Sequence, residues 1–406
     1  MTSRSSAQRG RAPSPRPTLR LITGGAGRPE RPPAELAARS RRDAARLVAL
    51  VLALNAFGLI IVLSASAVAF AVFARIDLAV LRRVAVPLLA VTVLLLLVVL
   101  APGIGSTVGG SSRWIGAGPL KIQPSELAKL AFVLFAADLV VRREHVEDQV
   151  RELVRPVVVV VGVMALLILK QPDMGTATVM LCIASAILYA GGVRGRLLGG
   201  VMGMLFLAGA VMALVAPYRR ARLLSFVNPF AHASTSGYQV VQSLVALGSG
   251  HLTGTGLGTS PAKWGYLPNA WTDFIFAVIG NEMGLIGGVL VLGAFVAFGW
   301  LGMRIAANSR DRFAGLVAVG ITAWIVCQAF INIGGVIGIL PETGIPLPFL
   351  SSGGSSLVVA LGAVGLLVNI GGQGVPARPR RAAPSAVRAP RAGPARPARV
   401  ATARVK

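Results

Sequence analysis

Residues 237–288 read GYQVVQSLVALGSGHLTGTGLGTSPAKWGYLPNAWTDFIFAVIGNEMGLIGG, and within them a broken polar stretch gives way to an apolar helix. The first part is rich in glycine and hydroxyl residues and is too often interrupted to form one spanning helix. Asp273 then stands directly before the apolar run 274–279. Between Asp173 and Asp273 the sequence contains no other acidic residue. A carboxylate at the mouth of a membrane helix, next to both water and lipid, is therefore the first candidate for chemistry.

The composition is that of an integral membrane protein. Hydrophobic residues make up 54% of the chain, charged residues 14%, and the mean hydropathy is +0.72, whereas soluble domains carry about 25% charged residues. Apolar runs recur close to the roughly 20 residues that a helix needs to cross a bilayer, and the alternating segments of a β-barrel are absent. We predict an all-α, polytopic helix bundle of about nine or ten transmembrane helices. The predicted spans are 47–74, 84–102, 125–141, 154–169, 175–191, 196–216, 274–299, 313–335 and 354–371.

The net charge of +25 is concentrated in the two tails, which hold half of the 40 basic residues. Both tails are rich in proline, alanine and glycine, so we expect disorder there. Basic tails beside membrane helices indicate cytoplasmic anchors against anionic lipid, and no nucleic-acid-binding motif accompanies the charge. We predict disordered cytoplasmic tails at 1–45 and 376–406 and a transmembrane domain at 46–375. Cys182 and Cys327 lie in apolar runs and are expected to be buried thiols without a disulfide.

The basic loops predict the topology. Arginines in the connections around 142–155, 194–196 and 304–312 belong on the cytoplasmic side. Segments 103–122, 170–174, 217–273 and 336–353 then face outward, and 217–273 forms a large extracytoplasmic loop. Nine spans place the basic N-terminus outside, against the same rule. Residues 47–74 are therefore either one long helix or a tight hairpin, broken near Ser64–Ser66, or else a span is missing.

Four cations lie in the large outer loop, where the positive-inside rule disfavours them: Arg219, Arg220, Arg222 and Lys263. Their retention there suggests an anionic partner, because arginine binds phosphate oxygens in bidentate fashion and lysine acts as a point charge. The alternative is that the arginines anchor the loop at lipid headgroups.

A second group of charges precedes and enters the span 125–141. Arg113 and Lys121 lie in the outer segment, and Glu126 and Lys129 follow at i, i+3 on the helix, where they can face each other. Charges inside a membrane pair or face a polar cavity. A purely structural salt bridge is an equal alternative for Glu126 and Lys129.

Two aspartates stand at helix starts. Asp173 follows Pro172 between two spans, and it is either a cavity residue or a helix N-cap. Asp273 is either a general base, with a pKa raised by partial burial, or the N-cap of a helix beginning at Phe274. The glycines and prolines of the last outer loop either let its backbone approach a ligand closely or simply build a rigid turn. It carries Asn332, Glu342, Ser351, Ser352, Ser355 and Ser356.

Other catalytic arrangements are missing from the sequence. Zinc-type clusters, Ser-His-Asp arrangements and phosphate-binding P-loops are absent, and His145, His232 and His251 show no metal-ligand spacing. No metal site is predicted.

Several motifs together resemble the SEDS family (shape, elongation, division and sporulation) of bacterial cell-wall proteins, and more closely its cell-division branch. They occur in the family's order over most of 46–371. The matching stretches are RWI at 113–115, QPSELAK at 123–129, QPDMGT at 171–176, GYQ at 237–239, QS at 242–243, GLG at 256–258, YLP at 266–268, TDFIF at 272–276 and PFLSSGGSS at 348–356.

This resemblance implies a peptidoglycan glycosyltransferase that polymerises lipid II on the outer face of the plasma membrane, at the division septum. It implies work with a class B penicillin-binding protein as transpeptidase and with other division proteins. Asp273 maps onto the family's proposed catalytic residue. The expected substrate-binding and cavity residues are Arg113, Lys121, Glu126, Lys129, Asp173, Arg219, Arg222, Gln239, Gln242, Ser243, Lys263 and Ser355.

The expected mechanism begins with Asp273, which deprotonates the 4-hydroxyl of the acceptor sugar. That oxygen attacks the anomeric carbon of the donor, and undecaprenyl pyrophosphate leaves with inversion. Fixed cations stabilise the leaving group, and a divalent ion, Mg²⁺ or Mn²⁺, could share the task.

The chain departs from the family's usual residues at four positions, which here hold Asn269, Trp271, Asn281 and Ser352. Two other functions fit the pattern. A lipid II flippase would explain the intramembrane charges and broken helices, although the special residues cluster on one face and no inverted repeat is visible. A non-catalytic division scaffold would use the tails and outer loops.

Overall fold

The computed structural model describes residues 62–101, 105–108, 111–116, 121–143, 150–215, 220, 225–309 and 311–373. The predicted tails and residues 47–61 lie outside this part. Helices dominate what is described, which confirms the predicted all-α membrane fold. The helices are α2 (Leu78–Val99), α3 (Pro124–Arg142), α4 (Arg155–Lys170), α5 (Met174–Ala190), α6 (Gly195–Val215), α8 (Tyr238–Ser249), α9 (Ile275–Ala307), α10 (Arg312–Val336) and α11 (Gly354–Gly372).

Five of the described helices are long and apolar enough to cross a bilayer: α2, α4 with the preceding π-helical turn η1 (Val150–Val154), α9, α10 and α11. Shorter apolar helices include Val62–Phe73 and α5. The span predicted at 84–102 in fact begins at Leu78, because Asp77 caps that helix by accepting a hydrogen bond from the Ala79 amide at 2.9 Å.

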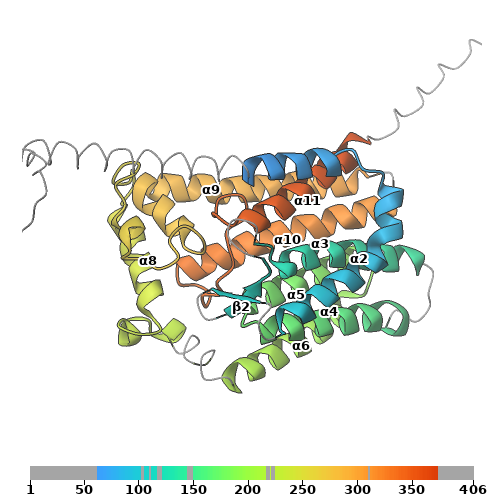
Figure 1. Ribbon diagram of the computed structural model, residues 1–406, viewed down its shortest axis with the longest axis horizontal. Helices are drawn as coiled ribbons and strands as arrows, with labels where there is room; N and C mark the ends of the chain where they lie inside the picture. The colour runs from blue at the N-terminus through green and yellow to red at the C-terminus, as the bar shows by residue number, and fades with distance from the viewer. Residues whose placement is uncertain are drawn as a thin grey trace, which may run out of the picture. The chain divides into compact units, whose positions relative to one another are not determined.

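Helix α10 forms the centre of the bundle. It is apolar on all faces, as expected for a helix surrounded by other helices, and it is the most buried of the five spans. It packs against α9, α5, α3 and α11, and Figure 1 shows α9, α10 and α11 running alongside one another. Cys182 on α5 and Cys327 on α10 form no disulfide, but both are half-buried and not fully buried as expected.

The large outer loop contains structure that the sequence did not reveal. Helix α8 and the single turns η2 (Phe230–His232) and η3 (Pro261–Trp264) fold within it. The segment after α8 inserts into a break in α9 at Gly284, whose φ of 66° is left-handed. There the Leu285 amide donates to the His251 carbonyl at 2.9 Å, and the Thr255 amide donates to the Asn281 carbonyl at 2.9 Å. The freed backbone groups of the kinked helix are thus satisfied by the loop.

Two short strands were also not predicted. β1 (Ser106–Val108) and β2 (Ser111–Trp114) pair antiparallel in the outer segment before α3. Arg113 on β2 donates from Nε to the Gln171 carbonyl at 2.9 Å and from its guanidinium to the Pro172 carbonyl. The hairpin is therefore fastened to the turn between α4 and α5.

The contacts at the two ends of the helices differ. At the basic end, Arg82 and Arg142 both bind buried Asp138 at 2.7 Å, and Arg312 donates to the Gly191 carbonyl at 3.3 Å. At the other end, Ser243 of α8 donates to the Val336 carbonyl at 2.9 Å. The polar motifs lie at this second end.

Among the alternatives for 47–74, a hairpin broken near Ser64–Ser66 is excluded. Val62–Phe73 is one continuous helix, in which the Ser66 hydroxyl donates to the Val62 carbonyl at 2.7 Å. Asn369 of α11 holds the C-terminal end of the helix Val62–Phe73 by donating to the carbonyls of Phe73 and Ile76, at 3.1 and 2.7 Å. Residues 47–61, the other part of the proposed hairpin, lie outside the described part.

Replacing Gly365 tests the packing of the helix Val62–Phe73 on α11. A Cβ at this position would collide with the Phe70 backbone carbonyl, so Gly365→Ala should cost about 1–3 kcal/mol of stability. Gly162 in α4 has open space around it, and Gly162→Ala is the matched control. Thermal unfolding in detergent should show a lowered midpoint for Gly365→Ala alone. Equal midpoints for the two variants would contradict this packing.

Candidate functional site

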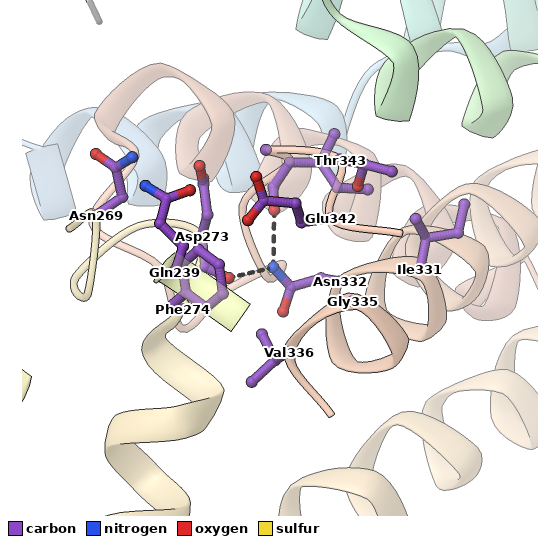
Figure 2. Close-up of a pocket in the computed structure, with 12 residues that line it drawn as sticks. Gln239, Asn269, Asp273, Phe274, Ile331, Asn332, Gly335, Val336, Glu342 and Thr343 are labelled. Atoms are coloured by element: carbon purple, nitrogen blue, oxygen red, sulfur yellow. Dashed lines mark hydrogen bonds between the residues drawn. The ribbon is translucent and has the colours of Figure 1, made fainter. Parts of the chain in front are cut away.

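A small polar cavity lies where α8, the start of α9 and the end of α10 meet. Its volume is about 30 Å³, which is room for one or two water molecules. Figure 2 shows the side chains around it, which come from α8, from the turn before α9, from α10 and from the last outer loop. The polar side chains among them are Gln239, Asn269, Asp273, Asn332, Glu342 and Thr343.

Asp273 is half-buried and lines this cavity, one residue outside α9. The alternative role as N-cap is not what the structure has, because Phe274 occupies the cap position and α9 has no side-chain cap. The turn is closed by the Asn269 carbonyl, which accepts from the amides of Thr272, Asp273 and Phe274 at 3.1, 3.1 and 3.2 Å. Asn269 has φ 58°, a left-handed conformation that asparagine adopts more readily than most residues. The Asp273 side chain lines the cavity and does not cap α9.

Glu342 and Asn332 are cavity residues that the sequence did not place beside Asp273. Glu342 brings a second carboxylate from the last outer loop. Asn332 of α10 donates from Nδ2 to the Asp273 carbonyl at 2.7 Å and to the Ile345 carbonyl at 2.8 Å (Figure 2). The available signal was the spacing of Gln328 and Asn332, two amides four residues apart in an apolar run.

Glu126 and Lys129 form the predicted i, i+3 pair, with both residues 1% exposed and 2.8 Å between Oε1 and Nζ. Lys129 also donates to the Gln328 side chain at 2.6 Å and lies over the Trp324 ring. Glu126 lines a second cavity of about 10 Å³, enough for about one water molecule. The charges are thus paired within the bundle.

Asp173 and Arg113 are occupied by backbone and neighbouring groups. Asp173 is 1% exposed and caps α5, accepting from the Thr176 amide at 3.1 Å and the Thr176 hydroxyl at 2.9 Å. This is the capping alternative for Asp173. Arg113 binds the two carbonyls of the adjacent turn.

Lys263 does not line the cavity and forms an ion pair with Glu282 of α9. Its ammonium also lies 5.2 Å from the centre of the Trp271 ring, and the Ser260 amide donates to the same Glu282 carboxylate at 3.3 Å. Lys263 therefore fastens the loop containing η3 to α9.

The other predicted site residues lie in separate places. Gln239 lines the Asp273 cavity, whereas Ser243, one turn further along α8, is fully buried and bonded to α10. Gln242 and Lys121 are half-buried, and Ser355 lies in the first turn of α11. Arg219 and Arg222 lie outside the described residues. Within the described part, no group of three or more His, Cys, Asp or Glu side chains is arranged to hold a metal ion.

Comparison with known proteins gives one consistent result. A family model described as "Cell cycle protein", for FtsW, RodA and SpoVE, matches residues 45–374. The chain is 41% identical over 293 residues to the probable peptidoglycan glycosyltransferase FtsW of Methylomonas methanica, covering 71% of this chain and 75% of that protein. It is 44% identical over 284 residues to stage V sporulation protein E of Bacillus subtilis, covering 70% and 77%.

A solved structure is similar as well. It belongs to work on the structural coordination of polymerization and crosslinking by a peptidoglycan synthase complex. The match has a TM-score of 0.66 and 26% identity, and it covers 78% of this chain and 89% of that one.

The buried pair can be tested by removing one charge or both. Lys129→Met leaves Glu126 charged and unpaired in the bundle, which should cost about 3–5 kcal/mol. Adding Glu126→Leu should recover most of that loss, because no charge then remains buried. Thermal unfolding of the single and double variants measures the effect. A double variant no more stable than Lys129→Met would show that the pair does not act as one unit.

The Lys263–Glu282 pair should control how tightly the loop 254–264 is held. Lys263→Met and Glu282→Gln each remove the pair, so each should speed limited proteolysis within 254–264. The double variant should be cleaved no faster than either single variant, since both act through one contact. Additive increases would mean that the two side chains work separately.

Proposed function

The chain belongs to the FtsW/RodA/SpoVE family of cell cycle proteins, and from this we propose that it is a peptidoglycan glycosyltransferase that polymerises lipid II during division. The family match runs through the whole helical region. The observation that carries the proposal is the placement of Asp273, half-buried in a polar cavity at the end of the bundle that the charge pattern assigns to the outside.

Asp273 is the proposed general base. Its carboxylate takes the proton of the acceptor's sugar 4-hydroxyl, and the oxygen attacks the anomeric carbon of the donor. The bond from that carbon to the pyrophosphate oxygen breaks, and undecaprenyl pyrophosphate departs with the bonding electrons. A single displacement gives a β-1,4 linkage with inversion. The position suits a base, because Asp273 is half-buried and lines a polar cavity.

The leaving pyrophosphate needs positive charge that the protein has not already used. Arg113 holds a turn and Lys263 pairs with Glu282, so both serve the scaffold. We assign the leaving-group role to Lys121, which is half-buried in the outer segment before α3, and to Arg219 and Arg222 of the large outer loop. Arginine is suited to this because it binds phosphate oxygens in pairs.

A divalent cation, Mg²⁺ or Mn²⁺, would bind at the same cavity if the reaction uses one. Glu342 and Asp273 supply carboxylate oxygens there, which are the ligands these ions prefer. Such an ion would supply positive charge for the leaving pyrophosphate.

The proposed partner is a class B penicillin-binding protein, which would crosslink the strands that this chain makes. The similar solved structure, from a peptidoglycan synthase complex, supports this pairing. The chain is a multi-pass membrane protein, and the FtsW-type relatives support a location at the division septum of the plasma membrane.

Asp273→Asn tests the proposed function. Loss of a general base should lower the rate of glycan polymerisation about 10²–10⁴-fold. The assay uses the purified protein with its transpeptidase partner and labelled lipid II, and strand length is read on gels. Asp311→Asn is the matched control, since Asp311 caps α10 at the opposite end and asparagine caps equally well.

Other outcomes separate the alternatives. Polymerisation by Asp273→Asn at the control's rate would refute the general base. Translocation of lipid II in liposomes, without polymerisation by the unmodified protein, would indicate a flippase. Neither activity would indicate a scaffold.

A further inference from the structure

We propose that Asn332 is a positioning residue, which sets the direction of the Asp273 carboxylate by holding that residue's backbone. The proposal rests on the proposed function, because it concerns the group that we assign as the base. Asn332 does not need to touch substrate in this role. It acts through Asp273.

One amide nitrogen joins two segments that are far apart in the sequence. Nδ2 of Asn332 donates one hydrogen to the Asp273 carbonyl at 2.7 Å and the other to the Ile345 carbonyl at 2.8 Å. The residue is 5% exposed, so water competes little for these bonds. Both donors of the side chain are therefore committed, and the turn before α9 is tied to the last outer loop.

The Asp273 carbonyl precedes the helical hydrogen-bond ladder of α9. The ladder of α9 begins with Phe274, whose carbonyl accepts from the amides of Ala277 and Val278 at 2.9 and 3.4 Å. The Asp273 carbonyl is instead held from α10, by Asn332. A shift in this peptide group would turn the carboxylate directly, since both are attached to the same Cα.

The tie is rigid because α10 clamps the outer loop twice. Gln328 lies one turn before Asn332 and donates to the Pro346 carbonyl at 2.9 Å, next to the Ile345 carbonyl that Asn332 holds. The Gln328 oxygen is itself fixed by Lys129 and Trp324, at 2.6 and 2.8 Å. The side chain that holds the Asp273 backbone is therefore attached to α10, the most buried of the five spans.

The oxygen of the Asn332 amide makes it possible to test a positioning role separately from a general structural role. The Oδ1 atom of Asn332 is buried and has no hydrogen-bond partner among the described residues. An unpaired buried oxygen destabilises a protein. Removing the whole amide therefore removes a penalty along with two bonds, and an apolar replacement of similar size need not unfold the chain.

The chain provides a matched control in Asn281 on α9. It is 1% exposed, and its Nδ2 donates to the Ala246 carbonyl at 2.9 Å and to the Ser249 hydroxyl at 2.6 Å. Its Oδ1 is also unpaired within the described part. Asn281 therefore has the same chemistry as Asn332, but it holds α8 and not Asp273.

The experiment compares Leu and Asp replacements at the two positions in the complex with the transpeptidase partner. Asn332→Leu and Asn332→Asp both lose the two donors, and a misdirected base should lower kcat about 10²-fold while KM changes less than about threefold. Asn281→Leu and Asn281→Asp should keep kcat within about threefold of the unmodified protein. Hydrogen exchange should quicken at the amides of Thr272 and Phe274 in the Asn332 variants only.

The outcomes that overturn the proposal are distinct from failure of the proposed function. Equal kcat values for the Asn332 and Asn281 variants, or a change in KM alone, would overturn it. Failure of both Asn332 variants to fold, with the Asn281 variants folded, would also overturn it by making the residue generally structural. Asp273→Asn in the same assay reports on the proposed function, because full activity there refutes the base whatever Asn332 does.

Discussion

Polar groups inside an apolar helix bundle must find partners within the protein, and this constraint organises the outer end of the structure. Gln328 and Asn332 project from α10 and donate to three backbone carbonyls of non-helical segments. Irregular backbone at the membrane is stable only when its groups are satisfied in this way. The same bonds that make the last outer loop and the turn before α9 tolerable also fix Asp273.

The charged residues follow the same constraint. Lys129 forms an ion pair with Glu126, Lys263 forms one with Glu282, and Arg113 donates hydrogen bonds to two carbonyls. The residues of the family motifs therefore fall into two groups, those bound to other parts of the protein and those that line the cavity. Several build the walls, whereas the cavity beside Asp273 is lined by amides and a second carboxylate. Proximity in sequence to catalytic motifs does not by itself make a cation available to substrate.

Periodicity and charge predicted most of the fold, because spans and loop polarity are local properties of the sequence. The i, i+3 pairing of Glu126 and Lys129 was predicted for the same reason. What the sequence could not show depends on contacts between distant segments. The insertion of 251–256 into α9 at Gly284, the fastening of β2 to Gln171, and the meeting of Asn332 with Asp273 all join residues more than twenty positions apart. The sequence also left open a break near Ser64–Ser66, whereas in the helix the Ser66 hydroxyl donates to the Val62 carbonyl one turn back.

The most direct test of the central claim is the distance from the Asp273 carboxylate to the acceptor sugar in an experimental structure with a lipid-linked acceptor bound. The account predicts a sugar hydroxyl within about 2.6–3.2 Å of a carboxylate oxygen, directly or through one water. An acceptor held elsewhere, with Asp273 turned toward lipid, would contradict it.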